Sequence, residues 1–321
     1  MAKEAFTVFE VGPRDGLQNE PVAVPLEDKI AFLNGLLAAG VRNIELGAFV
    51  RPDRVPQMAD TDEIYRRIES GEIRLGKARA WSLVPNRKGL ERALQAGARN
   101  IALFTAATDS FARQNIGMSV KASLAEFSGI VADIRSSGKS IHVRGYVSTA
   151  FGCPFEGKVN PRKPLKVIEG MLEAGVNEIS IGDTIGVATP NQVDLVIKPA
   201  LRMVGKRSAQ KLAGHFHDTR GTALANSLRA IELGVRTLDS SAGGLGGCPF
   251  APGASGNLAT EDLVYLLEGM GFRTGIHLHK LCETSAALLS KVFARTNRPI
   301  ASRYLQSYLA SASRTHSCAS C

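Results

Sequence analysis

The stretch LEDKIAFLNGLLAAGVRNIEL, residues 26–46, contains an amphipathic helix, a glycine and the start of a strand. Apolar residues recur at helical spacing until the glycine, where helices commonly end. The same joint, an alanine and a glycine followed by an isoleucine four positions later, occurs at Ala39-Gly40, Ala96-Gly97 and Ala174-Gly175. A joint that repeatedly leads from a helix into a strand indicates an internal βα repeat.

Short runs rich in β-branched residues recur along the whole chain and alternate with longer amphipathic stretches. The eight strand candidates are 6–11, 43–46, 79–84, 100–105, 141–148, 178–182, 211–217 and 235–241. Eight strands that alternate with helices predict a (β/α)8 TIM barrel over about residues 6–257. We expect additional helices over about 258–294 and a flexible, peripheral tail over about 298–321.

Size and composition are compatible with one domain. The chain has 321 residues, of which 44% are hydrophobic, and α/β barrels of this length are normally single domains. We therefore predict that residues 1–321 form a single domain. No apolar run approaches the roughly 18 residues of a membrane span, and the residues MAKEA before the first strand candidate leave no room for a signal or transit peptide. We expect a cytoplasmic protein without a membrane partner.

Charge and cysteine usage narrow the class of partner. The formal net charge of +9 comes from scattered lysines and arginines, which favours a phosphate-bearing small molecule over nucleic acid. Five cysteines without a secretory signal indicate reduced thiols. Cys318 and Cys321 form a C-x-x-C without a second pair, so a frayed tail is favoured over a zinc or redox site.

Polar residues follow several of the predicted strands. The catalytic groups of barrel enzymes lie at the carboxyl ends of the strands. The residues placed there are Arg14 and Asp15 after the first strand, Glu45 near the end of the second, Asp183 after the sixth and Asp218 after the seventh. The cation of Arg14 is expected to keep Asp15 ionised. A purely structural salt bridge between the two is the alternative.

The segment GHFHD, residues 214–218, places two histidines in one predicted strand. Side chains alternate along a strand, so we expect His215 and His217 to point to one face and Phe216 to the other. Both imidazoles could then reach one metal ion. Two hydrogen-bonded core histidines are the alternative, but at the end of a barrel strand metal binding is favoured.

The segment GGLGGCPFAPGASGNLATEDL, residues 243–263, follows the eighth strand. Its many glycines and two prolines predict a loop that closes over a ligand. Cys248 is then the reactive candidate, with an inert buried thiol as the alternative. Asn257 precedes a helical run, which makes it a candidate helix N-cap.

Five motifs together resemble those of the 3-hydroxy-3-methylglutaryl-CoA lyase family. They are VGPRDGLQNE, RGYVSTAFGCPFEGKV, ISIGDTIGVATP, GHFHDTRGTALAN and GGLGGCPFAPGASGNLATEDLVYLLEGMG. The similarity extends over about residues 7–290. The arginine-aspartate pair and the H-x-H are shared across a metal-dependent barrel superfamily of lyases and acyl-CoA condensing enzymes, whereas the glycine and cysteine loop is more specific to the lyases.

The resemblance implies roles for individual positions. Those that match the family's ligands for a divalent cation, Mg²⁺ or Mn²⁺, are Asp15, His215, His217 and Asn257. Those that match its catalytic groups are Arg14, Asp15, Glu45, Asp183 and Cys248. Those that match substrate-binding groups are Arg14 and Gln18. The resemblance also implies an acyl-CoA substrate, a homodimer and a place in the breakdown of leucine or other branched acyl groups.

The implied reaction is the cleavage of 3-hydroxy-3-methylglutaryl-CoA into acetoacetate and acetyl-CoA. A tertiary hydroxyl loses its proton, a carbon–carbon bond breaks and a thioester enolate leaves. A metal is expected to chelate the hydroxyl and the substrate carboxylate, and Arg14 to hold the enolate oxygen. We expect Glu45 or Asp183 to accept the hydroxyl proton and Cys248 to protonate the enolate. The division of roles among Glu45, Asp183 and Asp15 stays open.

Three departures from the family pattern concern the acyl pocket. They are Leu46-Gly47-Ala48, where hydroxyls usually follow the glutamate, Arg220 in place of Tyr or Gly, and Thr149-Ala150-Phe151 in place of a Cys-Ala-Leu type segment. A larger 3-hydroxy-3-alkylglutaryl-CoA or another branched hydroxyacyl-CoA is therefore an alternative substrate. A condensing synthase, a non-haem iron oxygenase and a non-catalytic CoA-binding barrel are less favoured.

Overall fold

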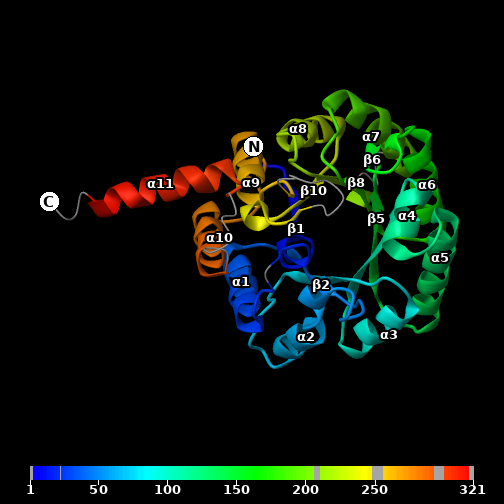
Figure 1. Ribbon diagram of the computed structural model, residues 1–321, viewed down its shortest axis with the longest axis horizontal. Helices are drawn as coiled ribbons and strands as arrows, with labels where there is room; N and C mark the ends of the chain where they lie inside the picture. The colour runs from blue at the N-terminus through cyan, green and yellow to red at the C-terminus, as the bar shows by residue number, and fades with distance from the viewer. Residues whose placement is uncertain (1–2, 22, 206–209, 248–255, 293–299, 318–321) are drawn as a thin grey trace.

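Eight parallel strands form a closed barrel in the computed structural model, which describes residues 3–21, 23–205, 210–247, 256–292 and 300–317 (Figure 1). In chain order the barrel strands are β1 (Thr7–Glu10), β2 (Asn43–Ala48), β3 (Arg79–Leu83), β4 (Asn100–Ala106), β5 (His142–Ser148), β8 (Glu178–Asp183), β9 (Leu212–Phe216) and β10 (Thr237–Ser240). The register between β1 and β10, with Thr7 opposite Thr237, closes the barrel. The predicted barrel is confirmed, and the predicted strands differ only at their ends.

Helices surround the barrel, as the βα repeat requires (Figure 1). The Ala-Gly joints work as expected: Gly40 and Gly175 end their helices in the left-handed conformation, with φ of 99° and 88°. The helices between barrel strands are α1 (Leu26–Ala39), α2 (Thr61–Glu69), α3 (Arg87–Gln95), α4 (Asp109–Ile116), α5 (Val120–Ser136), α6 (Arg162–Ala174), α7 (Pro190–Val204) and α8 (Ala223–Leu233).

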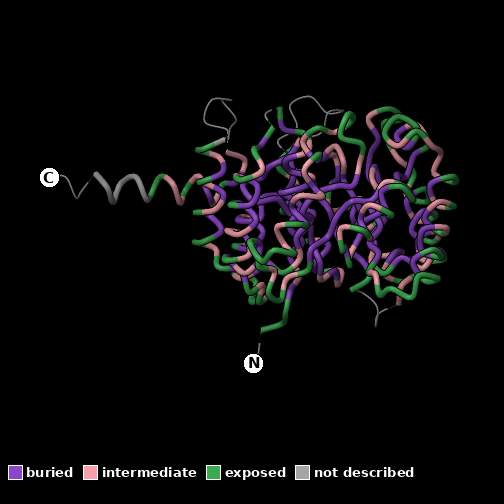
Figure 2. The backbone as a smooth tube through the Cα atoms, turned by 90° about the horizontal axis from the view of Figure 1, so that it is seen from below, coloured by how far each residue is buried: buried purple, intermediate pink, exposed green. Residues whose placement is uncertain are grey.

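The strands are buried on both faces (Figure 2). Their apolar residues, such as Ile44, Ile101 and Ile179, join one large hydrophobic core with the helices. Charged side chains are also fully buried in the strands, Glu45 and Arg144 among them. Buried charges require partners, and these side chains belong to the polar network described below.

Several elements were not predicted from the sequence. A π-helical turn, η1 (Gly12–Gly16), follows β1, and short 3-10 turns occur at η2 (Pro56–Met58) and η4 (Ala242–Gly244). A small hairpin of β6 (Gly152–Cys153) and β7 (Gly157–Lys158) extends the segment after β5. Of these, η1 and η4 lie at the carboxyl ends of β1 and β10 and shape the candidate site.

The carboxyl-terminal part contains α9 (Thr260–Gly269) and α10 (Leu278–Val292), which confirms the predicted extra helices. The tail predicted over about 298–321 contains a helix that the sequence analysis did not predict, α11 (Arg303–Ser317), which projects from the barrel (Figures 1 and 2). Its first turn is fixed because the Asp262 carboxylate accepts the backbone N–H groups of Arg303 and Tyr304, at 3.0 and 2.7 Å. Leu305 is fully buried and anchors the same turn.

Cys318 and Cys321 lie outside the described residues. Across the described ranges, every helix is too short or too polar to cross a membrane.

Candidate active site

The π-helical turn η1 places two charged side chains at the carboxyl end of the barrel. The Gly12 N–H donates to Glu10 Oε1 at 2.8 Å, and a Cβ at residue 12 would lie 2.6 Å from that oxygen, so a side chain there would displace the Glu10 carboxylate. Neighbours in a strand point to opposite faces, whereas neighbours in a helical turn lie closer together. Arg14 and Asp15 therefore contact each other, with Nη1 2.7 Å from Oδ1.

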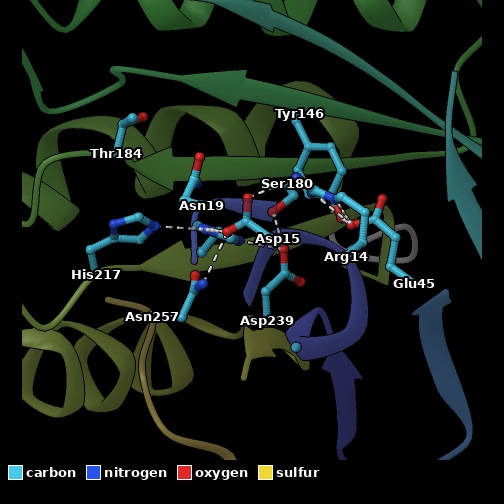
Figure 3. A network of polar contacts seen from close by, with 12 residues as sticks. Arg14, Asp15, Asn19, Glu45, Tyr146, Ser180, Thr184, His217, Asp239 and Asn257 are labelled. Atoms are coloured by element: carbon cyan, nitrogen blue, oxygen red, sulfur yellow. Dashed lines mark hydrogen bonds and ion pairs between the residues drawn. The ribbon is translucent and has the colours of Figure 1, made fainter. Parts of the chain in front are cut away.

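Asp15, His215 and His217 form one cluster beside this turn. The Nε2 atoms of the two histidines are 3.2 Å apart, and His215 Nε2 is 3.9 Å from Asp15 Oδ2. One ligand atom from each of the three residues lies within 4.8 Å of the others. The predicted orientation of the two histidines is confirmed. Figure 3 shows Asp15 between His217 on one side and Arg14 on the other.

Asn257 comes to the same cluster from the segment after the glycine-rich loop. Its backbone forms an antiparallel bridge with His217, and its Nδ2 donates to Asp15 Oδ2 at 3.0 Å. Gly246 allows this approach, because a Cβ there would lie 2.6 Å from Asn257 Nδ2. Helix α9 begins at Thr260, with Ala259 at the N-cap position, so the alternative of Asn257 as the N-cap was wrong.

The charge states of the cluster suit cation binding. Burial and the neighbouring His215 lower the pKa of His217 to about 4. Burial raises the pKa of Asp15, but Arg14 and the two histidines offset this and bring it to about 2. Burial also opposes protonation of His215, yet its hydrogen bond to Asp239 leaves its pKa above the usual value. The cluster thus offers an ionised carboxylate and a neutral imidazole at neutral pH.

This donor set fits a divalent cation. Two imidazole nitrogens that face each other at 3.2 Å can share only one proton, so at least one lone pair is available. A carboxylate oxygen and an amide group adjoin the same point. Carboxylate oxygens suit Mg²⁺ and Mn²⁺, and imidazole nitrogens suit first-row divalent metals, so the combination fits a divalent cation. Asp15, His215 and His217 are therefore a possible metal site.

Arg14 also pairs with Glu45, on the side away from the histidines. Its Nη2 and Nε lie 2.6 and 2.7 Å from Glu45 Oε2, and the arginine is only 6% exposed. Tyr146 donates to the same oxygen at 3.2 Å. The other oxygen, Oε1, is buried without a hydrogen-bond partner in the described part of the chain. Burial raises the pKa of Glu45, although Arg14 opposes the rise.

The structure does not bring every predicted residue into this cluster. Both oxygens of Asp183, the last residue of β8, accept backbone N–H groups, from Val187 and Ala188, at 3.0 Å each. Burial raises the pKa of Asp183 to about 6. Asp183 therefore holds the loop after β8, and the charge of His215 opposes the rise in its pKa.

The remaining predicted residues differ in their surroundings. Gln18 is partly buried, and its Oε1 has no partner among the described residues. Asp218 accepts the N–H of Ala223 at 2.9 Å, which stabilises the start of α8. Cys248 lies outside the described residues.

Reasoning from the sequence missed a set of polar residues inside the barrel. Asp239 Oδ2 lies 3.0 Å from His215 Nδ1, and Asp239 also contacts Arg144 and Ser180. Arg144 and Tyr146 alternate with apolar residues in the strand IHVRGYVS. A charged side chain on the inward face of a predicted barrel strand is a signal that could have identified them.

Comparison with known proteins places the chain in a family. The sequence model of the HMGL-like family matches residues 5–288. The hydroxymethylglutaryl-CoA lyase of Pseudomonas mevalonii is 45% identical over 289 residues, which cover 90% of this chain and 93% of the relative. The mitochondrial hydroxymethylglutaryl-CoA lyase of Bos taurus is 46% identical over 294 residues, covering 92% and 88%.

Solved structures agree. The HMG-CoA lyase of Bacillus subtilis superposes with a TM-score of 0.88 at 41% identity, over 96% of this chain and 99% of that one. An HMG-CoA lyase from Acinetobacter baumannii, in complex with coenzyme A and 3-methylmalate, gives a TM-score of 0.82 at 40% identity, over 89% and 90%. The family model matches residues 5–288, and the relatives named above are at least 45% identical over at least 90% of the chain. This chain therefore belongs to the HMGL-like family.

Proposed function

We propose that this protein is a carbon–carbon lyase that cleaves 3-hydroxy-3-methylglutaryl-CoA into acetoacetate and acetyl-CoA with the help of a divalent cation. The observation that carries the proposal is the cluster of Asp15, His215 and His217 in direct contact with Arg14. A metal site and a fixed cation are the two features that this cleavage requires. The relatives that bear the name of this activity support the proposed substrate.

Asp15, His215, His217 and Asn257 are the proposed holders of Mg²⁺ or Mn²⁺. Such an ion, when bound, polarises substrate oxygens and lowers the pKa of a hydroxyl group that it touches. The chain supplies the rest of the arrangement. Asp15 stays ionised because Arg14 contacts its other oxygen, so the turn η1 presents a metal ligand and a cation side by side.

Arg14 is the proposed partner of the thioester oxygen. A guanidinium group stays protonated through the reaction, and burial strengthens its interaction with a developing enolate. Stabilisation of this kind can contribute about 3 kcal/mol or more to the transition state. Because Glu45 and Asp15 hold the guanidinium on two sides, its position is fixed before the substrate arrives.

Glu45 is the stronger candidate for the base that removes the hydroxyl proton. Its Oε1 has no hydrogen-bond partner among the described residues and can accept a proton from the substrate, and burial raises its pKa. Asp183 is the weaker candidate because backbone groups occupy both of its oxygens. Cys248 stays the proposed proton donor to the enolate carbon, and Gln18 a proposed substrate contact.

The test is an assay of purified protein with 3-hydroxy-3-methylglutaryl-CoA and Mg²⁺, scored for acetyl-CoA. We expect EDTA to abolish product formation and Mn²⁺ to restore it. His217→Ala should lose activity, whereas His279→Ala, a matched change at an exposed histidine of α10, should not. Lack of acetyl-CoA, or activity that survives EDTA, would contradict the proposal.

The acyl group, the assembly and the location are part of the same proposal. Parallel assays with 3-hydroxy-3-ethylglutaryl-CoA measure whether the protein also cleaves a larger acyl-CoA. Such activity is the result expected if the departure at Leu46-Gly47-Ala48 widens the acyl pocket. We further propose one domain over residues 1–321, a homodimer, which light scattering of the purified protein would test, and a cytoplasmic location.

A further inference from the structure

A buried series of polar contacts leads from His215 into the barrel interior. Asp239, in β10, is 2% exposed. Its Oδ2 lies 3.0 Å from His215 Nδ1 and accepts the Ser180 hydroxyl at 2.8 Å. Its Oδ1 lies 2.6 Å from Arg144 Nη2. Each oxygen of this carboxylate thus has a defined partner, and one of those partners is the ring of a metal-site histidine.

Arg144 holds Asp239 in place from the opposite side of the barrel. The arginine is fully buried, and its Nε lies 2.9 Å from Glu178 Oε1. Its guanidinium carbon lies 3.7 Å from the centre of the Phe9 ring and 5.1 Å from that of Tyr146. A guanidinium fixed by two carboxylates and two rings has little freedom to rotate.

These contacts determine which ring nitrogen of His215 carries the proton and which one offers a lone pair to the metal site. A carboxylate paired with a permanently charged arginine only accepts hydrogen bonds, so the proton of a neutral His215 lies on Nδ1. The lone pair then lies on Nε2, the nitrogen that faces His217 at 3.2 Å and Asp15 at 3.9 Å. An imidazole binds a metal only through its unprotonated nitrogen.

We propose that Asp239, held by Arg144 and Ser180, is a positioning residue that fixes the tautomer and the ring orientation of His215 for metal binding. The inference rests on the metal-dependent function proposed above. Carboxylates that accept the second N–H of a metal-bound histidine raise metal affinity in proteins, and their loss typically weakens binding 10- to 100-fold. Ser180 strengthens the arrangement because it donates to the same oxygen as His215.

The experiment compares Asp239→Asn with Glu178→Gln as a matched control. Both changes neutralise a carboxylate that pairs with Arg144, but only Asp239 touches His215. The dissociation constant for Mn²⁺ is measured by electron paramagnetic resonance of the free ion, and folding by circular dichroism. We expect the constant to rise about 10- to 100-fold in D239N and to change less than about threefold in E178Q.

A second measurement reads the tautomer in the wild-type protein itself and uses a variant only to assign the signal. Nitrogen-15 NMR of histidine in the metal-free wild-type protein, assigned with His215→Ala, reports which ring nitrogen carries the proton. We expect protonated Nδ1 and unprotonated Nε2 for His215 when it is neutral. The opposite tautomer, or an equal loss of Mn²⁺ affinity in D239N and E178Q, would overturn the positioning role.

The outcomes also separate this inference from the function on which it rests. A wild-type protein that binds Mn²⁺ while D239N binds it equally well overturns the positioning role alone. A wild-type protein that does not bind Mn²⁺ overturns the proposed metal-dependent function and, with it, this inference.

Discussion

Replacement of Arg14 by glutamine tests the buried ion pair at the centre of the site. Arg14 is the cationic partner of Glu45, which is fully buried. In R14Q the Glu45 carboxylate keeps Tyr146 as its hydrogen-bond donor at 3.2 Å and loses its compensating charge. In E45Q, by contrast, Arg14 keeps an ion pair with Asp15 at 2.7 Å, where the aspartate is 19% exposed. The two variants therefore leave unequal charges uncompensated.

The expected magnitudes follow from this asymmetry. Removal of one partner that leaves a buried charge unpaired costs about 3–5 kcal/mol, whereas loss of a hydrogen bond to a still-paired group costs about 1–2 kcal/mol. With a denaturant slope of about 3 kcal/mol per molar urea, R14Q should unfold roughly 1–1.7 M urea earlier than the wild type. The double variant R14Q/E45Q removes the Glu45 carboxylate together with its cation and should therefore be more stable than R14Q.

The assay is urea unfolding of metal-free protein at neutral pH, followed by circular dichroism for the wild type and the three variants. Turnover is measured separately in the presence of Mg²⁺, where loss of Arg14 should lower kcat about 100- to 1,000-fold. An R14Q midpoint equal to or above that of E45Q would refute the reasoning. So would a double variant that is less stable than R14Q.

Three further changes test other parts of the molecule. Burial raises the pKa of Glu10 from 4.5 to about 7, so between these pH values the folded protein holds a proton that the unfolded chain releases. The free energy of unfolding should therefore fall by about 3 kcal/mol as the pH rises across this window. In E10Q the urea midpoint should depend less on pH over the same range. An equally steep profile in E10Q would contradict this. Cys248→Ser should lower kcat strongly while the dissociation constant for Mn²⁺ stays unchanged, and near-normal turnover would remove the thiol from the mechanism. Gly47→Ala places a Cβ 2.5 Å from Thr61 Oγ1 and should lower the free energy of unfolding by about 1–3 kcal/mol, measured by urea unfolding. The second change Thr61→Ala should restore part of this loss. An unaffected urea midpoint in G47A would show that the threonine can move.

The barrel could be predicted because each βα unit carries its own local signals. Gly40 and Gly175 end helices through their left-handed conformation, and this requirement is visible in the sequence without any tertiary contact. The pairing of His215 with His217 follows equally from the alternation of a single strand. Features that depend on neighbours along the chain were therefore the ones confirmed.

Features that depend on distant partners could not be predicted. The first turn of α11 is fixed by Asp262, about 40 residues earlier, and nothing local distinguishes it from a frayed tail. Arg144 and Asp239 are 95 positions apart in strands that are not neighbours in the barrel, so their contact depends on the geometry of the closed sheet. Asp183 was assigned to the active site by motif, but the backbone groups that occupy its oxygens became visible only in the structure.

The π-helical turn after β1 limits which insertions and deletions this protein can tolerate during evolution. The five residues Gly12–Gly16 bring two neighbouring side chains to a common point, and this depends on the number of residues in the turn as much as on their identity. A single-codon insertion or deletion there would rotate the aspartate away from the arginine and divide the centre into two unconnected halves. The length of this short segment should thus be more strictly constrained than that of the loops at the opposite end of the barrel.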